Sequence, residues 1–167
     1  MRLSGITAES VVDGPGLRYV IFTQGCFHSC PKCHNPESWD TEGGKEFSVK
    51  QIIRMAKQHK KTHRGITFSG GEPFLQADAL AQIAHAIRQT GWDVVIYTGY
   101  TYEELLDLSN TDAGIKGLFS LCDLLIDGKY IHKLRSAKLP FRGSSNQRII
   151  DMTKTRENGT ITLWHEN

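Results

Sequence analysis

Three cysteines stand close together in the stretch GCFHSCPKCHNPESWD, residues 25–40. Cys26, Cys30 and Cys33 follow the spacing C-x3-C-x2-C. Thiolates grouped in this way suit a soft metal, either zinc or the iron of an iron–sulfur cluster. Structural zinc takes four ligands. The residues that could supply a fourth ligand are His28, His34 and Cys122. The spacing favours an iron–sulfur cluster, with zinc and inert buried cysteines as the alternatives.

A cubane cluster held by three cysteines has one iron without a protein ligand. Three thiolates bind three of the irons in a 4Fe–4S cluster, and the fourth iron stays open to a substrate. Electron-transfer ferredoxins instead use four cysteines for each cluster. The cysteine loop therefore predicts a cluster that takes part in chemistry, beyond carrying an electron.

A second stretch with chemical potential, SGGEP, covers residues 69–73. The pair Gly70 and Gly71 lets the backbone approach a ligand closely. Glu72 offers a carboxylate that can accept hydrogen bonds from an ammonium group. A lone Gly-Gly-Glu triplet is usually only a turn. Here it ends an expected strand, about one β/α unit after the cysteines, which favours a functional role.

Strand and helix patterns alternate along the chain and should position these stretches. Apolar, β-branched runs predict buried strands, and amphipathic runs between them predict helices. The expected strands cover residues 17–24, 65–69, 92–98 and 122–128, with weaker signals at 147–152 and 160–164. The expected helices cover residues 48–59, 76–90 and 101–108, and residues 138–146 are expected to form a loop. This alternation predicts parallel β/α units within a single domain, residues 1–167.

Four stretches follow expected strands and should meet at one edge of the sheet. They are the cysteine loop, SGGEP, YTGY at residues 97–100 and DGKY at residues 127–130. Ligands bind at the carboxyl ends of parallel strands in such folds. We therefore expect the site on this rim. Capping boxes at Ser48 and Thr101 support two of the helices between the strands.

Composition and charge exclude several function classes. The 167 residues include 20 basic and 18 acidic side chains, and a net charge of +2 gives no electrostatic case for nucleic acid or an anionic membrane. No apolar run approaches the roughly 18–20 residues of a membrane span. The N-terminal stretch lacks the apolar segment of a signal peptide. We therefore expect a cytoplasmic protein, in which Cys122 is a small buried hydrophobe.

The combined motifs resemble the radical S-adenosylmethionine superfamily, in which C-x3-C-x2-C follows the first strand and Gly-Gly-Glu the second. Over nearly the whole chain, further stretches resemble the family of anaerobic ribonucleoside-triphosphate reductase-activating proteins. These stretches are VDGPGLR, CHNPESWD, TFSGGEPFLQ, LLIDGKY and LPFRGSSNQRI. With the short chain, the resemblance implies an α/β fold: an incomplete β/α barrel of about five or six mostly parallel strands, open at one side.

The resemblance also implies cofactors and partners. Cys26, Cys30 and Cys33 would hold one 4Fe–4S cluster, and its open iron would chelate S-adenosylmethionine. One electron, delivered by a flavodoxin-like donor, would cleave that cofactor and give a 5′-deoxyadenosyl radical. The radical would take a hydrogen atom from a glycine on the catalytic chain of the anaerobic reductase. The protein itself would supply binding, orientation and exclusion of water.

Specific residue roles follow from the same resemblance. The residues expected to border S-adenosylmethionine are Lys32, Cys33, His34, Gly70, Gly71, Glu72, Thr98, Gly99 and Asp127. Many superfamily members carry an aromatic residue just before the third cysteine, where this chain has Lys32, whose aliphatic stem could lie along a ring face. The residues expected near the glycine loop of the partner are Asp13, Gly14, Arg18 and Arg142.

Three other functions stay open from the sequence. An activase of another glycyl radical enzyme would share most of these motifs, but the chain length and the closing FRGSSNQR stretch favour the reductase branch. A small-molecule enzyme of the same superfamily would need a closed polar pocket. A zinc-binding interaction module, the non-enzyme alternative, would have no need of Gly-Gly-Glu.

Overall fold

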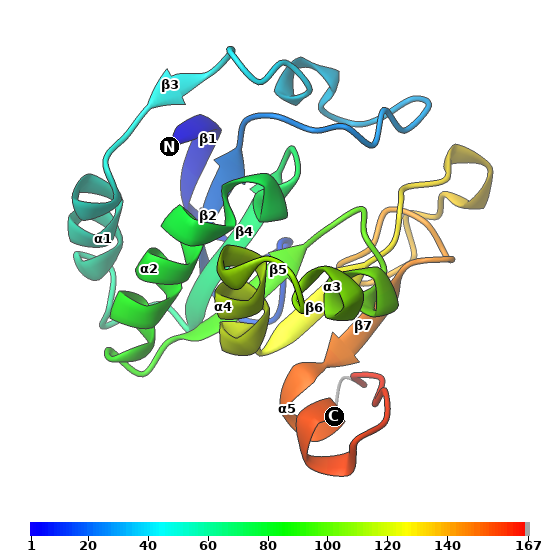
Figure 1. Cartoon of the computed structure of the whole chain (residues 1–167). Coiled ribbons are helices and arrows are strands. Elements are labelled where there is room, and N and C mark those ends of the chain that lie inside the picture. Colours follow the sequence, from blue (N-terminus) through cyan, green and yellow to red (C-terminus); the bar gives the residue numbers. More distant parts are fainter. Residues whose placement is uncertain (166–167) are drawn as a thin grey trace.

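One mixed sheet of seven strands forms the centre of the computed structural model, which describes residues 1–165 (Figure 1). In order across the sheet, the strands are β3 (Lys45–Glu46), β1 (Arg2–Ser10), β2 (Arg18–Thr23), β4 (Gly65–Gly70), β5 (Asp93–Tyr97), β6 (Leu124–Asp127) and β7 (Arg148–Asp151). Within the described residues, no pairing joins β3 to β7. The sheet is therefore open, as the sequence predicts.

The centre of the sheet is parallel and its edges are antiparallel. Strands β2, β4, β5 and β6 run parallel to one another. β1 pairs antiparallel with both β2 and β3, and β7 pairs antiparallel with β6. The expectation of five or six mostly parallel strands is thus corrected to a seven-stranded sheet in which four central strands are parallel.

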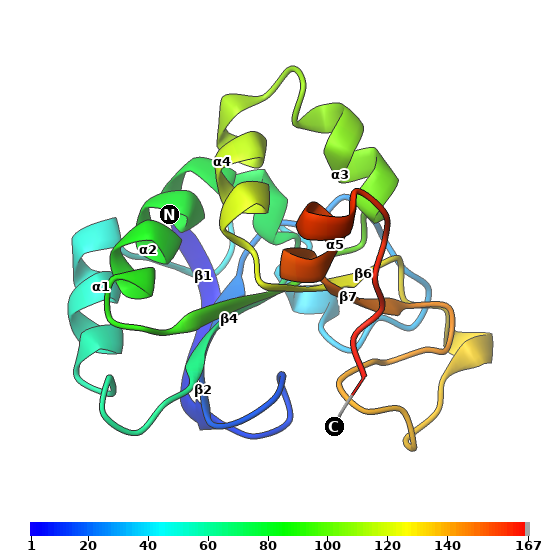
Figure 2. The same ribbon diagram turned by 90° about the horizontal axis from the view of Figure 1, so that it is seen from below.

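The α-helices cover one face of this sheet (Figure 2). They are α1 (Val49–Lys57), α2 (Ala77–Arg88), α3 (Tyr102–Leu108), α4 (Ala113–Leu121) and α5 (Met152–Asn158), and the short 3-10 helices are η1 (Pro36–Ser38), η2 (Pro73–Gln76) and η3 (His132–Leu134). The capping boxes expected at Ser48 and Thr101 are both present. Among residues 1–165, no helix has the length and apolarity needed to cross a bilayer.

The core follows the alternation of side chains along the strands. In β5, Val94 and Ile96 belong to the large hydrophobic cluster that also contains the buried helix residues. Val95, between them, belongs to a smaller cluster. In β4, Ile66 and Phe68 are fully buried in the large cluster. One face of the sheet is thus packed under helices, and long loops lie on the other side (Figure 2).

The sequence patterns do not predict β1, α4 or α5, and one expected strand is wrong. β1 shows a poor alternation of buried and exposed residues. Helix α4 contains Gly114 and Gly117, which lower helix propensity. The sequence predicts a strand at residues 160–164, but the structure forms only an isolated bridge there, between Leu163 and Ile150 of β7. Gly159 precedes it in a left-handed conformation, which turns the chain after α5.

Candidate active site

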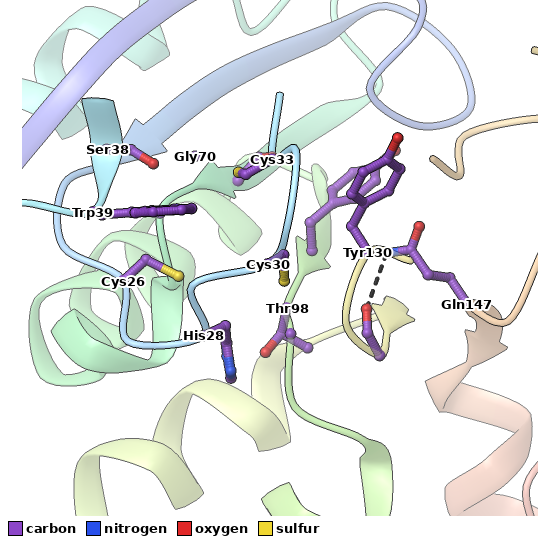
Figure 3. Close-up of a pocket in the computed structure, with 15 residues that line it drawn as sticks. Cys26, His28, Cys30, Cys33, Ser38, Trp39, Gly70, Thr98, Tyr130 and Gln147 are labelled. Carbon is purple, nitrogen blue, oxygen red and sulfur yellow. Dashed lines mark hydrogen bonds between the residues drawn. The ribbon is translucent and has the colours of Figure 1, made fainter. Parts of the chain in front are cut away.

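A cavity opens at the carboxyl ends of the parallel strands, where the sequence predicts the site (Figure 3). All four expected stretches contribute to it: the cysteine loop, SGGEP, YTGY and DGKY. The residues that line the cavity are Cys26, His28, Cys30, Cys33, Ser38, Trp39, Ser69, Gly70, Gly71, Tyr97, Thr98, Gly99, Gly128, Tyr130 and Gln147. The expected convergence on one rim is therefore present in the fold.

Backbone hydrogen bonds close the cysteine loop on itself. The Gly25 N–H donates to Ser38 O over 2.8 Å, and the Cys26 N–H donates to Trp39 O over 3.2 Å. These two bonds join the start of the loop to helix η1 and the residue after it. The loop is thus held by its main chain, which leaves its cysteine side chains available for a ligand.

The three thiols of the loop share one environment. Cys26, Cys30 and Cys33 are free and half-buried, and all three line the cavity, with Cys26 beside Trp39 (Figure 3). Burial raises the pKa of the Cys26 and Cys30 thiols, because a thiolate in a partly dry cavity is poorly solvated. A bound metal ion reverses that balance, since a coordinating thiol loses its proton outright. The donor set therefore fits a soft metal centre.

The end of β4 approaches the cysteine loop at a distance that only glycine permits. A Cβ on Gly71 would lie 2.3 Å from Gly25 O, and a Cβ on Gly70 would lie 2.5 Å from Thr23 N. Two backbone hydrogen bonds of 2.8 Å span the same contact, from Gly71 N–H to Thr23 O and from Glu72 N–H to Gly25 O. The glycine pair is therefore needed to bring β4 against the loop, whatever it does for a ligand.

Glu72 carries a buried carboxylate that joins three parts of the site. Its Oε2 accepts hydrogen bonds from His28 Nε2 at 2.7 Å and from the Gly99 N–H at 2.9 Å. Thr98 Oγ1 lies 2.9 Å from both carboxylate oxygens. The residue is 1% exposed and is not among those that line the cavity. Glu72 thus joins the cysteine loop to the end of β5, and its expected contact with an ammonium group stays a prediction.

His28 belongs to the site in a way that its position near the cysteines does not reveal. Its ring occupies the space beside the end of β5, where a Cβ on Gly99 would lie 2.3 Å from His28 Cδ2. The ring also meets Tyr100 edge-on, with 4.7 Å between centroids. With its bond to Glu72, His28 fastens the cysteine loop to the strand ends.

Asp127 ends β6 and is bound to Arg148 instead of facing the cavity. Its Oδ1 accepts from Arg148 Nε at 3.0 Å, and its Oδ2 accepts from the Tyr102 N–H at 2.8 Å. Arg148 also donates to both oxygens of Glu103, which lowers the pKa of that carboxyl to about 2. Asp127 is 1% exposed, and Gly128 is the neighbour that lines the cavity. Asp127 thus joins β6, β7 and α3 within the fold, and its expected contact with the cofactor stays a prediction.

Comparison with known proteins identifies the family. A family model described as a 4Fe-4S single cluster domain matches residues 12–150. The anaerobic ribonucleoside-triphosphate reductase-activating protein of Salmonella typhi is 34% identical over 155 residues, which covers 88% of this chain and 96% of the relative. The chain belongs to this family of radical S-adenosylmethionine activating enzymes.

Two further relatives show how broad the family is. The anaerobic ribonucleoside-triphosphate reductase-activating protein of Escherichia coli (strain K12) is 33% identical over 144 residues, covering 82% of this chain and 90% of the relative. The pyruvate formate-lyase-activating enzyme of Clostridium pasteurianum is 33% identical over 171 residues, covering 98% of this chain and 66% of the relative. A reductase-activating protein and a lyase-activating enzyme thus resemble this chain to a similar degree.

The thiols that line the cavity agree with the family's 4Fe–4S cluster. The three thiols at C-x3-C-x2-C line one cavity, and the matched cluster domain contains all of them. Cys122 lies elsewhere, fully buried after α4, where its thiol donates to Leu124 O at 3.2 Å. Burial raises the pKa of the Cys122 thiol. The expectation that Cys122 is a small buried hydrophobe is confirmed, and it cannot complete a zinc site with the loop.

The two residues that flank the third cysteine, Lys32 and His34, do not line the cavity. Lys32 is exposed, has a left-handed φ of 59°, and does not line the cavity. His34 is exposed as well, and its ring centroid lies 4.6 Å from that of Tyr130. Tyr130 lines the cavity, although the sequence indicates only that its DGKY stretch belongs to the rim. Gln147 is a further lining residue without a sequence signal, and its side chain donates to Gly128 O at 3.0 Å.

A second, more open hollow adjoins the cavity at Tyr97, which lines both. Two of the residues expected near the partner, Asp13 and Arg142, line this hollow. Its lining residues are Val11, Val12, Asp13, His34, Tyr97, Leu139, Pro140, Phe141, Arg142 and Gly143. The DGPG turn and the loop after η3 are therefore neighbours in the fold, although they are far apart in the sequence.

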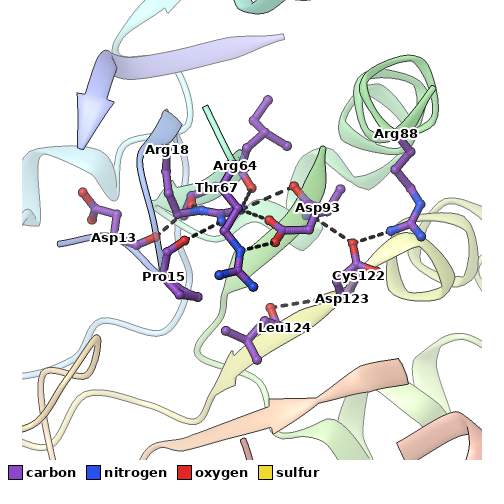
Figure 4. A network of polar contacts seen from close by, with 12 residues as sticks. Asp13, Pro15, Arg18, Arg64, Thr67, Arg88, Asp93, Cys122, Asp123 and Leu124 are labelled. Atoms are coloured by element: carbon purple, nitrogen blue, oxygen red, sulfur yellow. Dashed lines mark hydrogen bonds and ion pairs between the residues drawn. The ribbon is translucent and has the colours of Figure 1, made fainter. Parts of the chain in front are cut away.

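Arg18 does not reach the surface, which corrects its expected role in partner binding. It is 0% exposed, and its Nε donates to Thr67 Oγ1 at 2.6 Å (Figure 4). Its Nη2 lies 2.7 Å from Ile66 O and 2.6 Å from Asp93 Oδ1. Gly14 makes room for it, because a Cβ on Gly14 would lie 2.8 Å from Arg18 Cδ. Arg18 therefore supports the DGPG turn by donating to Pro15 O, and Gly14, a residue of that turn, leaves space for the arginine side chain.

Proposed function

We propose that this enzyme installs the glycyl radical on the catalytic chain of an anaerobic ribonucleoside-triphosphate reductase. The observation that carries the proposal is the convergence of three free thiols and glycine-lined strand ends on one cavity beside an open hollow. When bound, the 4Fe–4S cluster and S-adenosylmethionine supply a carbon-centred radical that takes a hydrogen atom from a glycine. A flavodoxin-like protein is the proposed electron donor.

The residues of the chain would bind and orient the two cofactors. Cys26, Cys30 and Cys33 would hold three irons of the cluster, and the fourth iron would have no cysteine ligand. The ends of β4 and β5 would border S-adenosylmethionine, because Gly70 and Gly71 present backbone without side chains there. Glu72 supports this border from behind through Thr98, Gly99 and His28, and so acts by positioning.

Tyr130 is the residue to which we assign the adenine contact. The position before the third cysteine holds Lys32, which lies outside the cavity. Tyr130 enters the same cavity from the loop after β6 and presents an aromatic ring there (Figure 3). An aromatic face suits a nucleobase, because the two flat π-systems stack. Tyr130 would thus supply, from the loop after β6, the aromatic contact that other superfamily members supply from the cysteine loop.

The open hollow is the proposed seat of the partner's glycine loop. Val11 and Val12 line it and are 67% and 72% exposed, so they offer apolar surface on which a protein segment could pack. Tyr97 connects the hollow with the cavity, which would bring a bound glycine toward the radical. A small-molecule substrate would call for a closed pocket, and this edge of the molecule is open.

Activation of another glycyl radical enzyme is the second candidate. It is favoured by the Clostridium pasteurianum pyruvate formate-lyase-activating enzyme, which matches 98% of this chain. The reductase remains the first choice, because the FRGSSNQR stretch resembles its activating proteins.

Electron paramagnetic resonance would test both targets. The protein is reconstituted with iron and sulfide under argon, then mixed with S-adenosylmethionine, a reductant and either the reductase catalytic chain or pyruvate formate-lyase. We expect a glycyl doublet on the reductase. Cys30→Ala should abolish the doublet, and Cys122→Ala, a matched cysteine outside the site, should keep it. A doublet on pyruvate formate-lyase alone would show that the lyase, and not the reductase, is the target. The absence of a doublet on both partners would contradict the activase function.

A further inference from the structure

A second group of metal-ligating side chains lies at the edge of the sheet opposite the cavity. Glu9 is near the end of β1, and His59 and His63 lie in the turns between α1 and β4. One ring nitrogen of each histidine and one carboxylate oxygen of Glu9 lie within 4.8 Å of one another. The register places the group there, since Ser10 pairs with Arg18 at the start of β2, whereas the cysteine loop follows the end of β2.

We propose that Glu9, His59 and His63 form a binding site for a divalent transition-metal ion of the zinc class. Two imidazoles and one carboxylate are a donor set that binds Zn²⁺, with water in the remaining position. The two histidines are four residues apart in one helical turn, in which the His63 N–H donates to His59 O over 3.2 Å. Side chains at this spacing project to the same side.

The hydrogen bonds of His63 leave one ring nitrogen suited to an ion. Its Nε2 lies 2.6 Å from Ala8 O, and a carbonyl only accepts, so Nε2 carries the proton and Nδ1 the lone pair. Metal-binding histidines commonly donate their other N–H to a backbone carbonyl in this way.

The present partner of that nitrogen can be released without leaving a donor unpaired. Thr62 Oγ1 lies 2.9 Å from His63 Nδ1, and it also lies 3.2 Å from His59 O. A hydroxyl has a single proton to donate. Thr62 can therefore turn its proton to His59 O when an ion takes Nδ1.

Aromatic packing fixes the two imidazoles and leaves the carboxylate free to move. His63 is 7% exposed and stacks on Trp92, with 5.6 Å between centroids and 24° between planes. His59 packs against Tyr19 at 5.5 Å and against His63 at 4.9 Å. Glu9 is exposed. Zinc bonds of about 2.0–2.2 Å require closer donors than the present group, so Glu9 is the ligand that would swing inward.

The surroundings set the strength and the role of this site. Lys60 and Lys61, in the same segment, oppose a cation, but both are exposed and their charges are screened by solvent and salt. A bound ion would tie the end of β1 to the segment that leads into β4. This site would therefore stabilise the edge of the sheet remote from the cysteines.

Equilibrium dialysis of the cluster-loaded full chain against zinc, under argon and followed by metal analysis, tests the site. We expect one zinc per chain in addition to the cluster iron. Glu9→Gln and His59→Ala should each weaken zinc binding about tenfold or more. His85→Ala, which removes an exposed histidine on α2, should leave it unchanged. Equal zinc binding by wild type and His59→Ala would overturn the proposal.

X-ray absorption at the zinc edge separates this site from the cysteine loop. Nitrogen and oxygen ligands lie about 2.0–2.2 Å from zinc, and cysteine sulfur lies about 2.3 Å away. We expect no sulfur shell. A full chain with Cys26, Cys30 and Cys33 all changed to Ser should still hold its zinc. A sulfur shell, or loss of zinc from this cysteine variant, would contradict the assignment, whether or not the chain activates a reductase.

Discussion

The two ends of the parallel strands β2, β4 and β5 differ in what their polar side chains contact. At the carboxyl ends, three half-buried thiols are free of disulfides. At the amino ends, one buried arginine is surrounded by protein oxygens. Arg18 contacts Thr67, Ile66, Pro15 and Asp93 (Figure 4). One end of the sheet thus keeps its donors for a ligand, and the other uses them within the fold.

This difference distinguishes residues that are available to bind a ligand from residues that stabilise the fold. A buried charge with good protein partners is costly to disturb and has little capacity left for a ligand. By that criterion, Glu72 and Asp127 resemble Arg18, although both stand at the rim beside the cysteines. The rim therefore contains acids that are bound to protein partners and thiols that are free to bind a ligand. Substitutions in these two groups should differ in their effects on stability and on iron binding.

Arg18→Met should have the largest effect on stability. Removing the fully buried guanidinium should cost about 3–5 kcal/mol of unfolding free energy, because Thr67 Oγ1, Pro15 O and Ile66 O lose a buried donor at about 1–3 kcal/mol each. Asp93 is partly exposed and keeps its bond to Arg64. Arg64→Ala is the matched control, since Arg64 pairs with the same Asp93 at the surface and should cost under about 1 kcal/mol. Urea unfolding measures both. An Arg18→Met protein that lost iron while remaining as stable as wild type would break the distinction between the two edges.

Gly71→Ala should have an intermediate effect, and its effect should fall on the cysteine loop. The new Cβ would lie 2.3 Å from Gly25 O, so the loop must move, at a cost of about 1–3 kcal/mol. We expect iron per chain to fall together with stability. Gly117→Ala in α4 is the control, because its Cβ would meet Ala81 at an ordinary 3.6 Å and should stabilise the helix by about 0.5–1 kcal/mol. Unchanged iron binding by Gly71→Ala would argue against a tight contact between β4 and the loop.

Glu103→Gln should have the smallest effect, and that effect should depend on pH. Arg148 lowers the pKa of Glu103 from 4.5 to about 2, so this ion pair stabilises the fold above pH 4.5 and the contribution is lost as pH falls toward 2. The Glu103 side chain is 58% exposed, so solvent limits the difference from wild type to under about 1 kcal/mol at pH 7. Unfolding curves between pH 7 and pH 3 should show the two proteins converging. Glu157→Gln, at an exposed acid, should show no such trend.

The parts of the fold that the sequence predicts are those with a strong local signal. The strand at residues 65–69 is a buried apolar run, and the structure has β4 at Gly65–Gly70. The capping box of Ser48 with Gln51 depends on residues three apart, and it is present. β1 carries exposed residues at its outer end and gives no such pattern. The glycines of α4 lower its helix propensity, so the sequence does not predict this helix, which tertiary packing stabilises.

The site was predictable in its chemistry but not in its contacts. The spacing of the cysteines and the Gly-Gly pair placed these residues on one rim, because both follow parallel strands. The partner of a buried carboxylate depends instead on which distant side chain the fold brings beside it. Asp127 meets Arg148 across an antiparallel pairing of β6 with β7, and no local pattern records that meeting. The burial of Arg18 likewise depends on Thr67 and Asp93, which are distant in the sequence.

The reduced cluster itself provides the most direct test of the account. The protein is reconstituted anaerobically, its iron is counted, and the electron paramagnetic resonance spectrum of the reduced state is recorded before and after S-adenosylmethionine is added. We predict four irons per chain, in keeping with a single 4Fe–4S cluster, and a spectrum that changes when the cofactor binds the open iron. A protein that took up zinc at the cysteines in place of iron, or a cluster spectrum unchanged by S-adenosylmethionine, would contradict it.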